Sequence, residues 1–456
     1  MKIVTAAVCA ALLPSIAFAQ ATPADVKTTP EPTFVVAKWK AKFYGFAELD
    51  TMLDSTQSFP EIQGNGIIVK PGVTSNNGRF QETIRNSRLG FALESPDFGG
   101  TRGLGLIEGD FFGFDPNPAY STPAAGAPAS QPSEAGFYTN PTFRIRHAWV
   151  KIESAWLDVL GGQTWSVLGG AGGFQPASVA LQGINGEIYQ RTEQIRIGKT
   201  YGAPGSLRFE WMVAALRPYQ RDVAVPDFSA MVRVELPGWV GYKSSGGTGG
   251  GLSGPQLAFS TVTKQFRAMP ATPASVTDWT TTTGSAVALD AIVPILPATK
   301  ESRAGALTLV AEASTGSGYN DSFTSLNAGI GSPGAPPKAA ASYSTTIDSG
   351  AVGWDSSGNF TAVDYQSLLV NLQYYVTNSF FVSGIFTDML SDNSYSFPHG
   401  GNGTFVDSKY GSLALMWDVT PATRVGLEGV WTRQHLSDTT NIRTNRRANF
   451  SMWFYF

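Results

Sequence analysis

The final segment, RTNRRANFSMWFYF (residues 443–456), constrains the fold more than any other part of the sequence. Read in alternate positions, it places Phe450, Phe454 and Phe456 on one face and Arg447 and Asn449 on the other. Successive side chains of a strand point to opposite faces, so this strand has one apolar and one polar face. A strand with lipid on one side and a wet lumen on the other needs this pattern, which predicts a membrane β-barrel.

The N-terminal residues 1–19 have a lysine, an apolar run and the A-x-A-like site Ala17–Ala19. This pattern predicts a secretory signal peptide. The one cysteine, Cys9, lies inside it, so the mature chain is expected to lack cysteine. Residues 20–38 are rich in Pro and Thr, and we expect an extended periplasmic lead-in there, with regular structure beginning at Trp39.

Composition supports the same class of protein. Charged residues make up only 15% of the chain and aromatic residues 12%, with 50 glycines, whereas globular chains carry roughly 25% charged residues. Beyond the signal peptide there is no apolar run of the roughly 18 residues that a spanning helix needs. A closed barrel is then the only way for the chain to cross a membrane. The net charge of -3 disfavours nucleic-acid partners.

Alternating segments of roughly ten residues recur along the chain, the length that a tilted strand needs to cross a bilayer. They predict an all-β fold, a transmembrane antiparallel barrel of about 16 strands over residues 39–456, with short periplasmic turns and long extracellular loops. The predicted strands are 39–53, 84–94, 101–114, 142–153, 156–166, 187–199, 206–216, 228–236, 255–268, 285–296, 302–314, 363–376, 379–390, 407–419, 422–434 and 443–456.

Two points stay open in this interpretation. Similar alternation could build a soluble sandwich or solenoid, although segments of roughly ten residues are longer than the usual five or six of soluble strands. The Gly-rich stretch 238–254 stands where a short turn is expected. It is either a flexible insertion or the sign of a misplaced strand boundary.

Several segments resemble one family of proteins. They are KFYGFAELD (42–50), IRNSRLGFALES (84–95), FRIRHAWVKIE (143–153) with GGQTWSVLG (161–169), and the terminal FSMWFYF. The chain resembles the DcaP-like porins of Gram-negative bacteria and, more generally, the sixteen-stranded trimeric porins. The resemblance implies an outer-membrane homotrimer that passes small, often anionic solutes, with dicarboxylates implied for some members.

The resemblance also implies partners and marks departures. The expected partners are the lipid bilayer, lipopolysaccharide and the barrel assembly machinery, which would read Phe456 as an assembly signal. Some members carry a periplasmic coiled coil that residues 20–38 cannot form. The stretch 238–254 and the long loop 315–362 are further departures.

A porin selects solutes by pore width and by charge in its lumen. The resemblance implies that the third long loop, 166–186, folds into the barrel as a constriction, and this loop is almost free of charge. Residues 142–267 carry thirteen Lys and Arg against eight Asp and Glu, a local charge of +5. Fixed guanidinium groups attract and orient carboxylates, which predicts a preference for anions.

The predicted pore-lining residues are the charged side chains of this region and of neighbouring strands: Arg88, Glu108, Asp110, Arg144, Arg146, Arg191, Arg196, Arg208, Arg233 and Arg447. Each arginine could instead pair with a carboxylate of the wall, such as Arg208 with Glu210 or Arg233 with Glu235. An unselective or cation-selective porin is the first alternative, because the whole chain is acidic.

No catalytic, metal or cofactor site is predicted. The three histidines are isolated from one another, with no second ligand at metal spacing. The alternation places His147 opposite to Arg146, toward lipid or a trimer contact. The remaining alternative is an outer-membrane protein without a transport role, such as an adhesin or a hydrolase.

Overall fold

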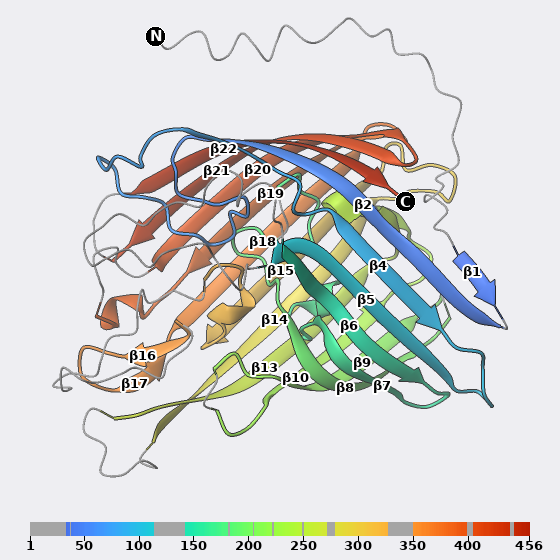
Figure 1. Ribbon diagram of the computed structural model, residues 1–456, viewed down its shortest axis with the longest axis horizontal. Coiled ribbons are helices and arrows are strands. Elements are labelled where there is room, and N and C mark those ends of the chain that lie inside the picture. The colour runs from blue at the N-terminus through green and yellow to red at the C-terminus, as the bar shows by residue number, and fades with distance from the viewer. Residues whose placement is uncertain are drawn as a thin grey trace, which may run out of the picture.

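The chain forms one closed antiparallel β-barrel of sixteen strands in the computed structural model (Figure 1). The structure describes residues 33–36, 38–113, 142–180, 183–203, 205–220, 223–248, 250–270, 279–326, 350–398, 405–437 and 442–456. Closure joins β2 (Trp39–Asp54) to β22 (Arg443–Tyr455), with Phe46 opposite Tyr455 and Asp54 opposite Arg447. All sixteen predicted strands are present, so the predicted fold class is confirmed.

Consecutive barrel strands pair with one another around the barrel. β3 (Arg79–Thr83) and β4 (Arg88–Glu94) both pair with β2 and together form one barrel strand. The remaining barrel strands are β5 (Arg102–Gly113), β6 (Thr142–Glu153), β7 (Asp158–Trp165), β8 (Arg191–Tyr201), β9 (Arg208–Leu216), β10 (Asp227–Glu235), β13 (Gln256–Ala268), β14 (Thr280–Leu296), β15 (Leu307–Ser317), β18 (Asp364–Tyr375), β19 (Phe380–Leu390), β20 (Phe405–Thr420) and β21 (Thr423–Leu436).

Regular structure begins earlier than the predicted Trp39. The short strand β1 (Thr33–Val36) pairs antiparallel with the start of β2, after a turn at Lys38, which has a φ of 68°. The β-branched residues Thr33, Val35 and Val36 favour extended backbone. The predicted signal peptide and the earlier part of the lead-in lie outside the described residues.

Side chains alternate between the interior and the outer surface as the sequence predicts. On β22, Arg443, Arg447 and Trp453 are buried, whereas Phe450 and Phe454 are exposed. The outer surface is largely apolar, with exposed Trp39, Trp156, Trp239 and Trp417 near one end of the barrel. This is the pattern of a lipid-facing band edged by aromatic side chains. Among the described residues no helix is long and apolar enough to cross a bilayer.

The two ends of the barrel differ in their connections. At one end, here called the short-turn end, residues 154–157 join β6 to β7 and residues 421–422 join β20 to β21. At the opposite, long-loop end lies the hairpin of β16 (Val352–Trp354) and β17 (Phe360–Ala362), whereas β1 lies at the short-turn end (Figure 1). Short turns at one end and long loops at the other form the layout of outer-membrane barrels.

The connection between β10 and β13 is the exception at the short-turn end. β10 and β13 lie where the alternation predicts them, so no strand boundary is misplaced. Between them lies a hairpin of β11 (Gly241–Ser244) and β12 (Gly250–Ser253), linked by the 3-10 turn η2 (Gly246–Thr248). The Gly-rich stretch is therefore an insertion, and it has regular structure.

A β-bulge in β6 overturns the predicted orientation of His147. Glu108 of β5 lies opposite His147 and the next residue, Gly109, lies opposite Ile145, so Arg146 is an extra residue in β6. A bulge leaves two successive side chains on the same face. His147 and Arg146 are therefore both buried in the interior, and His147 Nδ1 shares a hydrogen bond of 3.1 Å with Thr164 Oγ1.

Candidate functional site

The loop between β7 and β8 lies inside the barrel against one half of its wall. This connection, residues 166–190, contains the predicted constriction loop 166–186, and its described parts are 166–180 and 183–190. Its hydrogen bonds to inward-facing wall side chains run from β13 to β21: Gly169 N to Ser260 Oγ (3.1 Å), Ile188 N to Glu312 Oε1 (2.9 Å), Ala177 N to Asn371 Oδ1 (3.1 Å), Asn185 Nδ2 to Ser408 Oγ (3.0 Å) and Ala180 N to Glu428 Oε2 (2.6 Å).

The run of small residues in this loop has a backbone reason. Gly169, Gly170, Ala171 and Gly172 follow one another with φ values of 75°, 67°, 54° and 77°. This left-handed conformation is costly for most residues with a Cβ and accessible to glycine. At Gly172 a Cβ would also lie 2.5 Å from the Trp165 ring. The glycines therefore permit the tight bend with which the loop enters the lumen.

The Glu187 side chain holds a turn near the C-terminal end of this loop. Its Oε2 accepts hydrogen bonds from the backbone amides of Gly183 and Ile184, both at 3.1 Å. Burial raises the pKa of Glu187 to about 7, although the two amide donors and Lys243 act in the opposite direction. The loop conformation thus contains a carboxyl group that titrates near neutral pH.

The first long loop occupies the same half of the interior. Ile68 N donates to Gln434 Oε1 of β21 at 2.8 Å, and Arg443 of β22 donates to Ile68 O at 3.0 Å. Asn65 Oδ1 accepts a hydrogen bond of 3.0 Å from Gly186 N, which joins the two loops.

The β7–β8 loop also reaches the wall from β4 to β10. Arg146 donates to the Tyr189 hydroxyl at 3.3 Å. Phe174 belongs to the same buried apolar cluster as Met212 of β9 and Met231 of β10. The part of that wall that stays most exposed to water is near the short-turn end.

A buried charge cluster forms the first part of that wall. Arg146 donates to Glu108 Oε1 at 2.9 Å and to Asp110 Oδ2 at 3.1 Å, and Arg88 Nε lies 3.6 Å from Glu108 Oε1. Arg144 binds both oxygens of Asp110, at 2.9 and 2.6 Å. The side chains of Arg88 and Arg146 are buried, whereas that of Arg144 is 35% exposed. Arg144 is therefore the member of this cluster that water reaches most readily.

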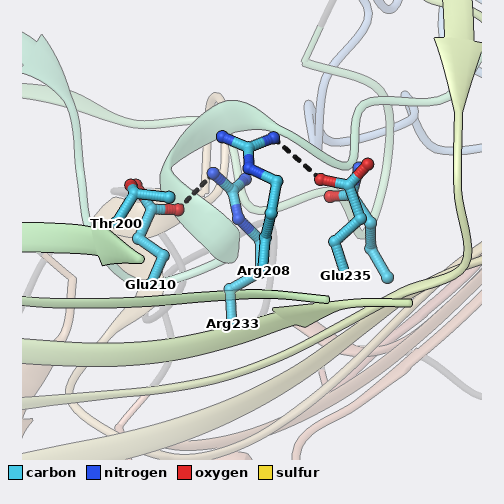
Figure 2. Close-up of a pocket in the computed structure, with 6 residues that line it drawn as sticks. Thr200, Arg208, Glu210, Arg233 and Glu235 are labelled. Carbon is cyan, nitrogen blue, oxygen red and sulfur yellow. Dashed lines mark hydrogen bonds and ion pairs between the residues drawn. The ribbon is translucent and has the colours of Figure 1, made fainter. Parts of the chain in front are cut away.

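A second set of charges, here called the arginine ladder, consists of Arg208, Glu210, Arg233 and Glu235 on β9 and β10. Arg208 Nη1 lies 2.9 Å from Glu235 Oε2, and Arg233 forms an ion pair with Glu210 (Figure 2). With Thr200 and Gln256, these four side chains line a polar cavity of about 70 Å³. The arginine side chains are 35% and 27% exposed, so both guanidinium groups remain in contact with water.

The ladder pairs differ from those that the sequence suggests. Arg208 lies directly opposite Glu235 and Arg233 directly opposite Glu210 in the β9–β10 register. Directly opposite residues of an antiparallel pair have Cβ atoms about 5 Å apart, closer than residues two apart on one strand. The proposed pairs Arg208 with Glu210 and Arg233 with Glu235 are therefore wrong, because each arginine bonds across the strands.

The remaining predicted residues fall into different environments. Arg196 on β8 is partly buried beside the ladder, and none of the hydrogen bonds or ion pairs found among the described residues involves it. Arg191 stacks over the rings of Trp165 and Tyr189, at 4.7 and 5.2 Å from their centroids. Arg447 is buried in the barrel wall and donates two hydrogen bonds to Asp54, at 2.8 and 2.7 Å.

Phe456, the predicted assembly signal, continues the seam between β22 and β2. Its backbone exchanges hydrogen bonds of 3.0 and 3.2 Å with Gly45, and its ring stacks on Phe43 at 5.6 Å. A Cβ at Gly45 would lie 2.9 Å from that ring, so the glycine makes room for it. This packing is structural, and the role in assembly stays a prediction.

Sequence reasoning missed several polar groups of the interior. Arg303 and Arg424 both pair with Asp418 near the short-turn end, and Lys243 of β11 donates to Gly173 O at 3.0 Å. Alternation could have placed Arg424 and Asp418 in the lumen, but no local pattern shows that a turn residue such as Lys243 reaches a distant loop. Within the described residues, no group of His, Cys, Asp or Glu side chains is arranged to hold a metal ion.

No protein-family model matches the chain, and no curated protein matches it in sequence. Solved structures do match it. The outer membrane channel DcaP of Acinetobacter baumannii superposes with a TM-score of 0.65 at 15% identity, covering 93% of this chain and 99% of that one. An anion-selective porin from Comamonas acidovorans gives a TM-score of 0.50 at 9% identity, covering 92% and 100%. The chain thus has the sixteen-stranded fold of outer-membrane channels, as the resemblance to DcaP-like porins predicts.

Proposed function

We propose that this protein is an outer-membrane porin through which small hydrophilic solutes diffuse passively, with a preference for anions such as carboxylates and dicarboxylates. The observation that carries the proposal is the wall from β8 to β10 near the short-turn end, where water-exposed arginines line a polar cavity. The short-turn end would face the periplasm and the long-loop end the cell exterior.

The anion preference follows from the charges on this wall. Arg196, Arg208 and Arg233 face Glu210 and Glu235, three positive groups against two negative ones. A guanidinium group offers a planar fork of N–H donors that matches a carboxylate. Both ladder arginines already hold a glutamate, so a solute carboxylate would share or displace an existing partner. That exchange favours passage over tight retention, as conduction requires.

The ion pairs of the arginine ladder also support the alternative, an unselective or cation-selective porin. Fully paired arginines leave little net field, and the whole chain has a charge of -3. An unselective or cation-selective porin would follow if the glutamates dominate the field in the lumen. Homotrimer formation, contact with lipopolysaccharide and recognition of Phe456 by the assembly machinery belong to the proposal as well, because the resemblance to DcaP-like porins implies them.

Solute uptake by proteoliposomes tests the transport role. We expect liposomes that contain the purified protein to swell in isosmotic solutions of a small sugar and of a small dicarboxylate salt, whereas protein-free liposomes do not. The same protein denatured by heating before reconstitution is the control. A correctly folded barrel that admits neither solute would contradict the porin proposal and favour an outer-membrane protein without a transport role.

A further inference from the structure

The insertion between β10 and β13 turns into the barrel at the short-turn end. Leu236 N donates to Pro255 O at 2.9 Å, which closes the two barrel strands behind the insertion. The insertion contains β11 and β12, and the buried residues of β11 are Gly241, Tyr242 and Ser244. A turn exposed to the periplasm would leave these residues in water, so their burial shows that the hairpin is packed against other parts of the chain.

The hairpin is held by side chains that line the lumen. Thr308 Oγ1 of β15 donates to Tyr242 O at 2.8 Å. Gln373 of β18 bonds both backbone groups of Ser244, accepting from its N–H at 2.8 Å and donating to its carbonyl at 3.0 Å. The Tyr242 ring packs edge-on against Tyr375, with centroids 5.1 Å apart. These contacts replace the neighbouring strand that the hairpin lacks and fix its backbone inside the barrel.

The hairpin reaches the far side of the barrel. Arg424 of β21 donates from Nη1 to Ser244 Oγ at 3.1 Å and also to Gly246 O. At Gly247 a Cβ would lie only 2.6 Å from Trp453 Nε1 of β22. β22 is seven strands along from β13 in a barrel of sixteen, so the insertion crosses nearly the full width of the lumen.

A cluster of cations and aromatic rings supports this crossing. The Arg303 guanidinium lies 4.8 Å from the Tyr242 centroid and 5.3 Å from that of Tyr375. Arg303 and Arg424 share the carboxylate of Asp418, and both arginine side chains are buried. The attraction between a cation and an aromatic face strengthens when both are shielded from water. A mobile flap would not retain such buried, directional contacts, so the cluster indicates a docked element.

The hairpin also meets the constriction loop beside the arginine ladder. Lys243 Nζ donates to Gly173 O of that loop at 3.0 Å. A Cβ at Gly173 would lie 2.9 Å from Arg233 Nη1, so the loop touches the ladder at the same residue. The two elements enter from opposite ends of the barrel and join at the edge of the β8–β10 wall.

We propose that the β11–β12 hairpin is a second constriction of the channel, which covers the β14–β22 half of the lumen from the periplasmic side and directs solutes along the arginine ladder. This inference rests on the proposed porin function. It makes selectivity depend on two elements, so removing the hairpin opens a route that bypasses Arg208 and Arg233.

Replacing residues 238–253 with Asn-Gly tests this role, since Leu236 and Pro255 already close the strands behind it. We expect the single-channel conductance to increase roughly two-fold, because the hairpin covers about half of the cross-section of the lumen. We also expect larger sugars to enter liposomes. Selectivity for anions should fall at the same time. Heat-modifiable gel mobility of the variant would show that the barrel still closes.

Two substitutions on β18 separate the hairpin from the loop without a deletion. Gln373→Leu removes both side-chain bonds to Ser244, whereas Asn371→Leu, two residues away on the same face, removes the bond to Ala177 of the constriction loop. Both variants lose the 2.7 Å bond from Gln373 Nε2 to Asn371 Oδ1, so they differ in their contacts to the hairpin and to the loop. We expect Gln373→Leu to give a conductance increase in the same direction as the deletion, and further removal of the hairpin from this variant to add little. Asn371→Leu followed by the deletion should retain the full effect of the deletion.

The outcomes distinguish the two proposals. A wild-type protein that conducts, with a folded hairpin deletion of equal conductance and equal size limit, would overturn the second constriction and leave the porin proposal intact. A wild-type protein without conductance, whose hairpin deletion conducts, would instead identify the hairpin as a closed plug and overturn its role as a partial constriction. Absence of conductance from both folded proteins would contradict the porin function itself.

Discussion

At the scale of single residues, Glu187 is expected to make the docking of the β7–β8 loop depend on pH. In the docked loop its pKa is about 7, whereas the ordinary value is 4.5. The docked loop therefore binds more protons than an undocked one between these values, and docking weakens as pH rises through this window. Across this pH window the free energy of loop docking changes by about 3 kcal/mol in total. Docking should be constant below about pH 4 and above about pH 8.

Current recordings at pH 5 and pH 8 test this prediction. We expect more frequent fluctuations of the wild-type current at pH 8, and a Glu187→Gln variant that keeps the quiet behaviour of pH 5 at both values. Lys243, whose pKa burial lowers to about 8, contributes only near the upper limit. Equal pH dependence in the wild type and in Glu187→Gln would assign the effect to another group.

At the scale of elements, the seam between β2 and β22 depends on a buried ion pair. Arg447 binds both oxygens of Asp54, and the two side chains are 1% and 0% exposed. Removing one partner leaves a buried charge, which costs about 3 to 5 kcal/mol. Arg447→Met should therefore lower the free energy of unfolding by about this amount.

The neighbouring residue offers a matched control for that substitution. Arg446 lies on the exposed face of the same strand near the long-loop end, so Arg446→Met should change stability far less. Denaturant unfolding of both variants in lipid vesicles measures the difference. Equal destabilisation by the two substitutions would show that the seam does not depend on the buried pair.

The elements could be predicted because their signal is local. Alternation along each strand reports directly on lipid and lumen, and β22 shows this from Arg443 to Tyr455. The orientation of His147 could not be predicted, because the bulge at Arg146 arises from pairing with β5 and changes the alternation within one strand. Cross-strand partners such as Arg208 and Glu235 likewise depend on a register that a single strand does not contain.

The interior was less predictable than the wall for a physical reason. The hydrogen bonds that hold the loops join residues far apart in the sequence, such as Ser244 with Gln373 and Ala177 with Asn371. These loop segments are small and polar, as surface turns also are. Their sequence therefore contains no sign of whether they turn outward into water or inward into the lumen.

At the scale of the whole molecule, the side of the barrel that holds the interior loops differs from the side that carries the exposed arginines. The hydrogen bonds that hold the interior loops and the β11–β12 hairpin lie mainly on β13 to β22, whereas water-exposed arginines lie on β6 to β10. In the proposed porin, this asymmetry places the exposed arginines beside the route that solutes take. A pore with focused charge on one wall selects ions even when the protein as a whole is acidic.

The zero-current potential across a planar bilayer under a KCl gradient tests this account most directly. We expect the zero-current potential of the wild-type protein to have the sign that indicates selectivity for anions. The double variant Arg208→Gln with Arg233→Gln should move it toward the cation side, and Glu210→Gln with Glu235→Gln should move it further toward the anion side. A wild-type potential on the cation side, or shifts of the same sign for both pairs of substitutions, would contradict an anion-selecting arginine ladder.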